Sequence, residues 1–355
     1  MPARFRRNLE AIPATVYTDD MDTRKTVVVG GGAWGTALAA HACRRGHTVA
    51  QWLLEPDLAA AVREKRENPK FLPGILLPAG IEATSETRGL LDGAAWVLSA
   101  VPGAHSREVY RRFRGTVPDE AVWVTATKGI EPGTDAFPSR VVEEELERPA
   151  LALSGPTFAR EVASGLPAAV VIAGEEMPAA AFQHDFSDTA LRVYTNEDLL
   201  GVQLAGSLKN VIAIAAGLVE GLGMGTNCTA ALITRGLAEM ARLGAAMGAQ
   251  AATFHGLAGM GDLVLTCTGS LSRNRTLGIR LGGGERLEDV LASTTSVAEG
   301  VRTVRAAVEL AQRHDVEMPI AREVHRVLHE GGEPRASLER LMRRPLTAED
   351  TPVNS

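Results

Sequence analysis

Cysteine is scarce in this sequence, with 3 cysteines among 355 residues. Cys43, Cys228 and Cys267 are odd in number and form no C-x-x-C pair, so neither a disulfide framework nor a zinc site is indicated, and we expect no metal. Residues 1–23 lack the apolar core of a signal peptide, and we expect them to form a flexible N-terminal extension. A reducing cytoplasm without membrane insertion is the setting these absences predict.

An excess of positive charge is also lacking. The chain has 37 basic and 43 acidic residues, a formal net charge of −6. Such a balance provides no general attraction to nucleic acid or to anionic lipid. We therefore expect no nucleic-acid partner, and any negatively charged ligand must be held by a local site.

Lysine is rare even among the basic residues. The sequence has five lysines, at Lys25, Lys65, Lys70, Lys128 and Lys209. Arginine stays protonated near neutral pH, whereas lysine can release its proton when its surroundings lower its pKa. In a chain so biased toward arginine, a lysine among apolar residues therefore invites a chemical explanation.

The pattern along the chain predicts two domains, as the length also suggests. Short apolar segments alternate with helical stretches up to residue 194, which is typical of βαβ units and a mostly parallel, doubly wound Rossmann-type α/β sheet. From 195 the apolar residues recur at helical spacing, which predicts an all-α C-terminal domain. We expect a dinucleotide-binding domain over 24–194, a helical substrate-binding domain over 195–345 and a flexible tail over 346–355. The strands are expected at 26–30, 48–53, 95–101, 121–126, 150–154, 168–173 and 191–194.

A β-branched segment followed by G-x-G-x-x-G begins at residue 26 and opens the first expected helix. Gly30 permits the tight turn, Gly32 lets the backbone approach a pyrophosphate, and Gly35 allows close packing of helix and strand. The helix N-terminus then offers free amides to the phosphates. Because Glu55 follows Gly35 by twenty positions, the motif predicts dinucleotide binding more strongly than its glycines alone. A glycine-rich turn of another α/β protein is the alternative.

Two lysines are candidates for proton transfer or anion binding. Lys209 has small or apolar residues at three and four positions on either side, so a helix would partly desolvate it and lower its pKa. An ammonium that reaches the surface is the competing interpretation. Lys128 follows a predicted strand at the edge where open α/β sheets present ligand groups, although a solvated loop lysine fits equally well.

A second polar constellation lies in the expected helical domain. Asp262 could orient a lysine or a hydroxyl, and Arg273 offers a planar fork suited to phosphate. From spacing alone, a helix cap at Asp262 and a solvated position for Arg273 are equally consistent.

Seven motifs follow one another along the chain, at 30–39, 126–129, 153–159, 208–211, 230–236, 261–263 and 272–274. In this order they resemble those of the bacterial NAD(P)-dependent sn-glycerol-3-phosphate dehydrogenase family. The resemblance covers about residues 25–330 and implies reversible reduction of dihydroxyacetone phosphate, a small phosphorylated substrate, in phospholipid biosynthesis. It leaves a homodimer open.

The resemblance also implies roles for individual residues. Lys209 matches the family's proton donor and acceptor, assisted by Asp262, and Lys128 is included in this catalytic set. Substrate contacts are implied for Lys128, Gly155 and Thr157, together with Lys209 and Asp262, and a phosphate site for Ser272, Arg273 and Asn274. Cofactor contacts are implied for Ala33, Trp34, Lys128, Ala159, Arg273, Val297 and Glu299, in addition to the glycines and Glu55.

The end of the second expected strand bears on the choice of cofactor. Glu55 occupies the acidic position that accepts hydrogen bonds from a free ribose 2′-hydroxyl, whereas Leu53 and Leu54 leave the family's basic position apolar. We therefore expect NAD to be preferred, with NADP as a second cofactor. Alternative functions are a related dehydrogenase for another phosphorylated ketone, one for a carboxylated substrate, and a non-catalytic dinucleotide sensor.

Overall fold

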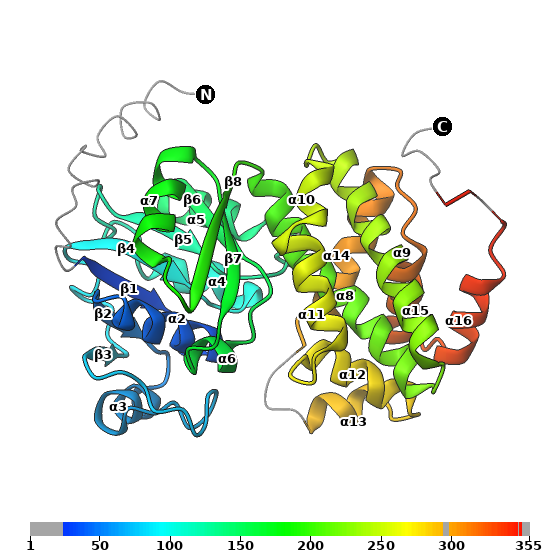
Figure 1. Cartoon of the computed structure of the whole chain (residues 1–355), viewed down its shortest axis with the longest axis horizontal. Coiled ribbons are helices and arrows are strands. Elements are labelled where there is room, and N and C mark those ends of the chain that lie inside the picture. The colour runs from blue at the N-terminus through cyan, green and yellow to red at the C-terminus, as the bar shows by residue number, and fades with distance from the viewer. Residues whose placement is uncertain (1–23, 294–297, 347, 350–355) are drawn as a thin grey trace. The chain divides into compact units, whose positions relative to one another are not determined.

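The computed structural model describes residues 24–293, 298–346 and 348–349, and these divide into two compact units (Figure 1). The first unit contains residues 24–127, Pro138–Leu153 and Thr157–Glu197, and the second contains Lys128–Phe137, Ser154–Pro156 and the described residues from Asp198 onward. The main division therefore falls three residues after the predicted boundary at 194. Two short segments that precede this boundary, including Lys128 and Gly155, nevertheless belong to the second unit.

An eight-stranded sheet forms the centre of the first unit, with strand order β3-β2-β1-β4-β5-β6-β7-β8. Pairing is parallel between neighbours from β3 to β6 and between β7 and β8. The order of the first six strands is that of a dinucleotide-binding sheet. The strands are β1 Lys25–Val29, β2 Thr48–Trp52, β3 Ile81–Thr84, β4 Ala94–Ser99, β5 Val122–Thr125, β6 Ala150–Ser154, β7 Ala168–Ala173 and β8 Leu191–Asn196.

All seven predicted strands are present, and β6 and β7 have the predicted bounds. Strand β3 was not predicted; it has four residues, lies at the edge of the sheet, and exposes Glu82 between buried Ile81 and Ala83. So short a run of alternation carries little signal on its own. Its place is set by pairing with β2 rather than by local pattern.

Helices follow most strands of the first unit, as expected for βαβ connections. Helix α2 packs against β1, β2 and α6. These helices are α2 Ala33–Arg44, α3 Pro56–Lys65, α4 Gly103–Arg111, α5 Pro138–Leu146, α6 Ala159–Ala163 and α7 Glu176–Phe186.

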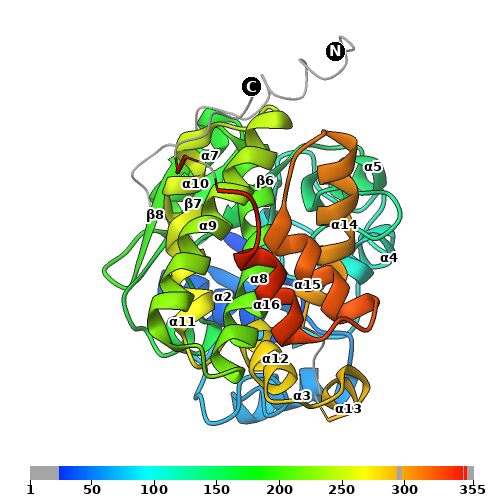
Figure 2. The same cartoon turned by 90° about the vertical axis from the view of Figure 1, so that its right-hand side faces the viewer.

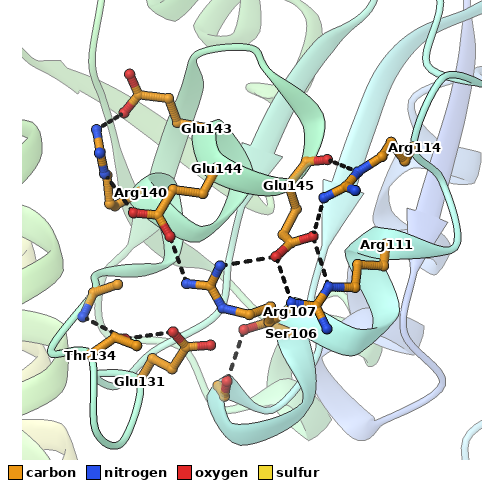
Figure 3. A network of polar contacts seen from close by, with 12 residues as sticks. Ser106, Arg107, Arg111, Arg114, Glu131, Thr134, Arg140, Glu143, Glu144 and Glu145 are labelled. Carbon is orange, nitrogen blue, oxygen red and sulfur yellow. Dashed lines mark hydrogen bonds and ion pairs between the residues drawn. The ribbon is translucent and has the colours of Figure 1, made fainter.

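Helices α4 and α5 are joined by arginines around one buried carboxylate (Figure 3). Glu145 is 3% exposed and accepts hydrogen bonds from Arg107 (2.9 Å), Arg111 (3.0 Å) and Arg114 (2.7 Å). Burial alone would raise the pKa of Glu145, but the arginines reverse this effect and hold it below the usual value. The network therefore fixes a charged, structural contact between two helices.

The second unit is helical, and its centre is α8, Leu199–Gly221. Figure 2 shows the helices around it, and α9, α11, α12, α14 and α15 all contact it. Asp198 begins α8 by accepting a hydrogen bond from the Gly201 N–H at 2.8 Å. The other helices are α9 Gly225–Ala246, α10 Ala251–His255, a π-helical turn at Leu257–Gly261, α11 Asp262–Thr268, α12 Arg273–Gly282, α13 Leu287–Ala292, α14 Gly300–Arg313, α15 Pro319–His329 and α16 Pro334–Met342.

Glycines allow α8 and α12 to pack with their backbones nearly in contact. A Cβ at Gly217 would lie 2.1 Å from the Arg275 carbonyl oxygen, and one at Gly278 would lie 2.1 Å from the Ile214 carbonyl oxygen. Neither distance is compatible with a side chain, so larger residues would force these helices apart. This close approach brings the start of α12 beside the middle of α8, where Lys209 and Asn210 lie.

Helix α8 is long and apolar enough to cross a membrane by length and composition, and all of its most apolar window is buried inside the structure. Such burial is typical of the core helix of a globular unit. Lys209 is one of its buried residues, 7% exposed, which confirms the desolvation predicted from its neighbours.

Candidate functional site

The glycine-rich turn between β1 and α2 has the geometry of a dinucleotide-binding loop. Gly30 has φ +136°, and a Cβ there would lie 2.7 Å from the Ala100 carbonyl oxygen. A Cβ at Gly35 would lie 2.3 Å from the Gly30 carbonyl oxygen, so both glycines are required by close packing. Gly32 begins α2 without a side-chain cap, and nothing lies within 4 Å of the Cβ it lacks.

The residues at the start of α2 fit a pyrophosphate group. Ala33 is the first helical residue, and the first turn has no acidic side chain that would repel an anion. The indole Nε1 of Trp34 is buried and has no hydrogen-bond partner among the described residues. A buried donor without a partner is costly, so a bound ligand oxygen at this turn would remove that cost. Thus Gly30, Gly32 and Trp34 fit the predicted dinucleotide.

A second site lies within the helical unit, where two lysines share one aspartate. Lys209 Nζ donates to Asp262 Oδ1 at 2.5 Å and to Thr266 Oγ1 at 2.9 Å. Lys128 Nζ donates to Asp262 Oδ2 at 2.6 Å and to the Gly155 carbonyl oxygen at 3.3 Å. The structure therefore brings together three residues that were predicted separately, at 128, 209 and 262.

The charges of this cluster shift the pKa values of its members. Burial lowers the pKa of Lys209 to about 8, an effect that Asp262 opposes and Lys128 reinforces. Burial alone would raise the pKa of Asp262, but the two lysines reverse this and keep it below the usual value. The cluster has two positive charges and one negative charge, so it suits an anionic ligand and keeps Lys209 close to proton release.

The hydrogen-bond donors of Lys209 also indicate that the cluster can bind a ligand oxygen. An ammonium has three N–H donors, and described residues accept two of those at Lys209. Thr266, which accepts one of them, donates in turn to the Asp262 carbonyl oxygen at 2.6 Å. Lys209 is thus held in place and retains one donor for a further oxygen.

Ser154 is a candidate that the sequence reading missed. Its hydroxyl is buried and has no partner among the described residues, and a Cβ at Gly206 of α8 would lie 2.8 Å from it. The residue is the last of β6 and precedes Gly155, whose carbonyl accepts from Lys128. Its position at the end of a strand could have drawn attention to it, because open α/β sheets present ligand groups there.

In the predicted phosphate site, one side chain forms no hydrogen bond or ion pair with a described residue, and the other two are hydrogen-bonded within the protein. Arg273 begins α12, is exposed, and forms no hydrogen bond or ion pair with another residue in the described ranges. Ser272 caps the helix, since its hydroxyl accepts from the Arg275 N–H at 3.3 Å. The Asn274 side chain donates to Asn210 Oδ1 at 2.9 Å and accepts from the Gly300 N–H at 3.0 Å. Arg273 is therefore the member best able to bind phosphate.

The remaining predicted cofactor contacts lie in different parts of the chain. Ala159 begins α6 in the first unit, to which Thr157 also belongs. Glu299 precedes α14 in the second unit; burial raises its pKa to about 7, although Lys128, Lys209 and Arg273 oppose this. Val297 lies outside the described residues.

Glu55 lies just before α3 and pairs with a cation that the sequence reading did not consider. Lys70 Nζ donates to Glu55 Oε1 at 2.8 Å. Two arginines nearer in sequence bind other groups: Arg63 donates to the Ala83 carbonyl oxygen and Arg66 to the Leu77 carbonyl oxygen. The acidic residue at the predicted ribose position is thus already neutralised.

Comparison with known proteins finds consistent similarity over both units. The family profile for the N-terminus of NAD-dependent glycerol-3-phosphate dehydrogenase matches residues 25–180, and the profile for its C-terminus matches residues 198–339.

Individual relatives give the same result. A glycerol-3-phosphate dehydrogenase (NAD(P)+) of Koribacter versatilis is 48% identical over 332 residues, which cover 92% of this chain and 98% of the relative. Another, from a Geobacter species (strain M21), is 49% identical over 330 residues, which cover 92% and 98% of the two chains. A crystal structure of glycerol-3-phosphate dehydrogenase from Coxiella burnetii has 37% identity and a TM-score of 0.86, covering 91% of this chain and 99% of that one.

Proposed function

The chain belongs to the NAD-dependent glycerol-3-phosphate dehydrogenase family, and we propose that it interconverts dihydroxyacetone phosphate and sn-glycerol 3-phosphate with NAD(P)H or NAD(P)+. The reaction would provide the backbone for glycerophospholipid synthesis in the cytoplasm. Within this proposal, residues 24–194 serve mainly to bind the dinucleotide and residues 195–345 to bind the substrate. The observation that carries it is the buried Lys209–Asp262–Lys128 cluster.

The cofactor supplies, when bound, the hydride that converts the C2 ketone into an alkoxide. Gly32 and the N-terminus of α2 would hold its pyrophosphate, and Glu55 its adenosine ribose. Lys209 holds a proton at Nζ and delivers it to the C2 oxygen as negative charge develops there. In the reverse direction, neutral Lys209 accepts the proton of the C2 hydroxyl.

The other residues of the cluster position and tune this amine. Asp262 fixes the direction of Nζ through its 2.5 Å hydrogen bond, and Lys128 lowers the pKa of Lys209 by charge repulsion. Arg273, which forms no hydrogen bond or ion pair with another described residue, is the proposed anchor for the substrate phosphate. Gly155 and Thr157, with Ser154 nearby in sequence, are proposed to contribute further substrate contacts.

A pH-dependent assay tests this proposal in both directions. Reduction needs protonated Lys209, so its rate should fall as the pH rises through about 8, whereas oxidation needs neutral Lys209 and should increase through the same range. The assay follows NADH and NADPH absorbance with dihydroxyacetone phosphate and with a panel of other phosphorylated and carboxylated ketones. Faster turnover of another ketone, or dinucleotide binding without any turnover, would contradict the proposal.

A further inference from the structure

The Glu55–Lys70 pair lies at the end of β2, where a Rossmann-type sheet contacts the adenosine ribose of its dinucleotide. Glu55 has an extended backbone, with φ −91° and ψ 119°, and its carboxylate does not cap α3. Both side chains reach solvent, since Glu55 is 36% and Lys70 50% exposed. The pair is therefore accessible to a ligand.

A buried asparagine anchors the turn that presents Lys70. Asn68 is 0% exposed, and its Nδ2 donates to the Gly31 carbonyl oxygen and to Thr36 Oγ1, both at 2.8 Å. Its Oδ1 accepts from the Phe71 N–H at 3.0 Å, and its carbonyl accepts from the Leu72 N–H at 2.9 Å. The backbone carrying Lys70 is thus tied directly to the glycine turn of the dinucleotide site.

Lys70 retains donors after it has paired with Glu55. One of its three N–H groups donates to Glu55, and the ammonium also lies 4.9 Å from the centroid of the Phe71 ring. Within residues 24–293, Lys70 is the one cation that forms an ion pair with Glu55. It can therefore contact a second anion without abandoning the first.

We propose that Glu55 and Lys70 together form a dual selector, a pair of residues of which one recognises the adenosine ribose of NAD(H) and the other that of NADP(H). This proposal rests on the proposed use of NAD(P). Glu55 accepts hydrogen bonds from the free 2′-hydroxyl of NAD(H). Lys70 binds the 2′-phosphate of NADP(H) and offsets the repulsion between that phosphate and Glu55. Lys70 is thus a specificity-determining residue that makes the second cofactor acceptable.

Direct binding measurements on Lys70→Met test this selector. The substitution keeps an unbranched chain over Phe71 but removes the charge, so NADPH should bind about tenfold more weakly or worse, whereas NADH affinity should change less than about threefold. Lys70→Arg should restore most of the NADPH affinity, because it retains a cation. Lys65→Met is the matched control: Lys65 ends α3, is exposed, and forms no ion pair with a described residue, so both affinities should stay unchanged.

The small ligands 2′,5′-ADP and 5′-AMP isolate the 2′-phosphate from the rest of the cofactor. Competition against bound NADH should show that Lys70→Met weakens 2′,5′-ADP but not 5′-AMP. The idea is overturned if Lys70→Met leaves NADPH binding intact, or if it weakens NADH and NADPH equally, which would indicate a structural role. These binding ratios are independent of turnover, so their failure is distinguishable from a lack of activity on dihydroxyacetone phosphate.

Discussion

Asp262 in the helical unit and Glu145 in the sheet unit are both buried carboxylates bound by cations, but the cations differ. Asp262 is 1% exposed and contacts two lysines, whereas Glu145 is 3% exposed and contacts three arginines. In both cases the cations overcome the effect of burial and hold the carboxylate pKa below its usual value. Lysine can release a proton near neutral pH and arginine cannot. The first cluster is therefore suited to chemistry, and the second to holding α4 against α5.

Replacing Lys209 with Met should produce the largest effect, because it removes the proton donor and leaves length and apolar contacts. Turnover should fall by about 10²-fold or more, while NADH binding stays nearly unchanged. Lys209→Arg should be equally inactive, since a guanidinium keeps its charge but does not release a proton. Steady-state kinetics and NADH titration check this, with Arg107→Lys as the matched change at Glu145. Near-normal turnover of either Lys209 variant would remove the distinction between the clusters.

Arg273 extends the comparison to an arginine that forms no hydrogen bond or close ion pair with a carboxylate of the described residues, although its charge acts on Glu299. Arg273→Ala should raise the KM for dihydroxyacetone phosphate by about 30-fold or more, which corresponds to roughly 2 kcal/mol of lost phosphate contact. Dihydroxyacetone without phosphate should be a poor substrate for both forms. An equal loss on both substrates would show that Arg273 supports the structure instead.

Glu239 provides a buried carboxylate without an ion pair among the described residues. It is 2% exposed and accepts from the N–H groups of Ile320 (2.8 Å) and Ala321 (3.3 Å) at the start of α15. Burial raises its pKa to about 7, against the opposing effects of these amides and of Arg242 and Arg344.

The raised pKa gives a signed prediction for stability. The folded state binds the proton of Glu239 more tightly than the unfolded state, so this stabilisation is complete below pH 4.5 and is lost as the pH rises through about 7. Relative to Glu239→Gln, the wild-type free energy of unfolding should decrease by on the order of 2–3 kcal/mol from pH 5 to 8. Urea denaturation of both proteins across this range tests it. Glu299 is present in both proteins, so its titration cancels when their free energies of unfolding are subtracted. If the two free energies changed with pH in parallel, the raised pKa would not belong to Glu239.

Glu145→Gln should have a smaller effect than the changes at Lys209, Arg273 and Glu239. The loss should be about 1 kcal/mol of stability, because Arg111 and Arg114 are 58% and 60% exposed and water can solvate them again. Turnover should remain within about twofold of wild type, since no proton is transferred at this site. Urea denaturation and steady-state kinetics measure both quantities. A large loss of activity in this well-folded variant would show that the arginine cluster is functional as well.

Local sequence pattern predicted much of the fold but less of the site. The glycine turn and seven strands were predictable because glycine spacing and short apolar runs can be recognised from adjacent residues, whereas the four-residue edge strand β3 lacks such a run. Ser154 lies at the end of a predicted strand, but only the packing of α8 shows that its hydroxyl is buried without a partner among the described residues. The phosphate contact of Asn274 stays a prediction, while the structure adds that its side chain joins Asn210 to Gly300.

Local sequence pattern specifies a dinucleotide-binding turn at Gly30, an apolar helix around Lys209, and the residue types available for catalysis. Tertiary structure decided which of them meet: Lys128 and Lys209 reach Asp262 from 134 and 53 residues away. It also decided that Lys70, rather than Arg63 or Arg66, neutralises Glu55. Periodicity and turn chemistry act over a few residues, whereas these ion pairs form between distant segments that strand pairing and helix packing bring together.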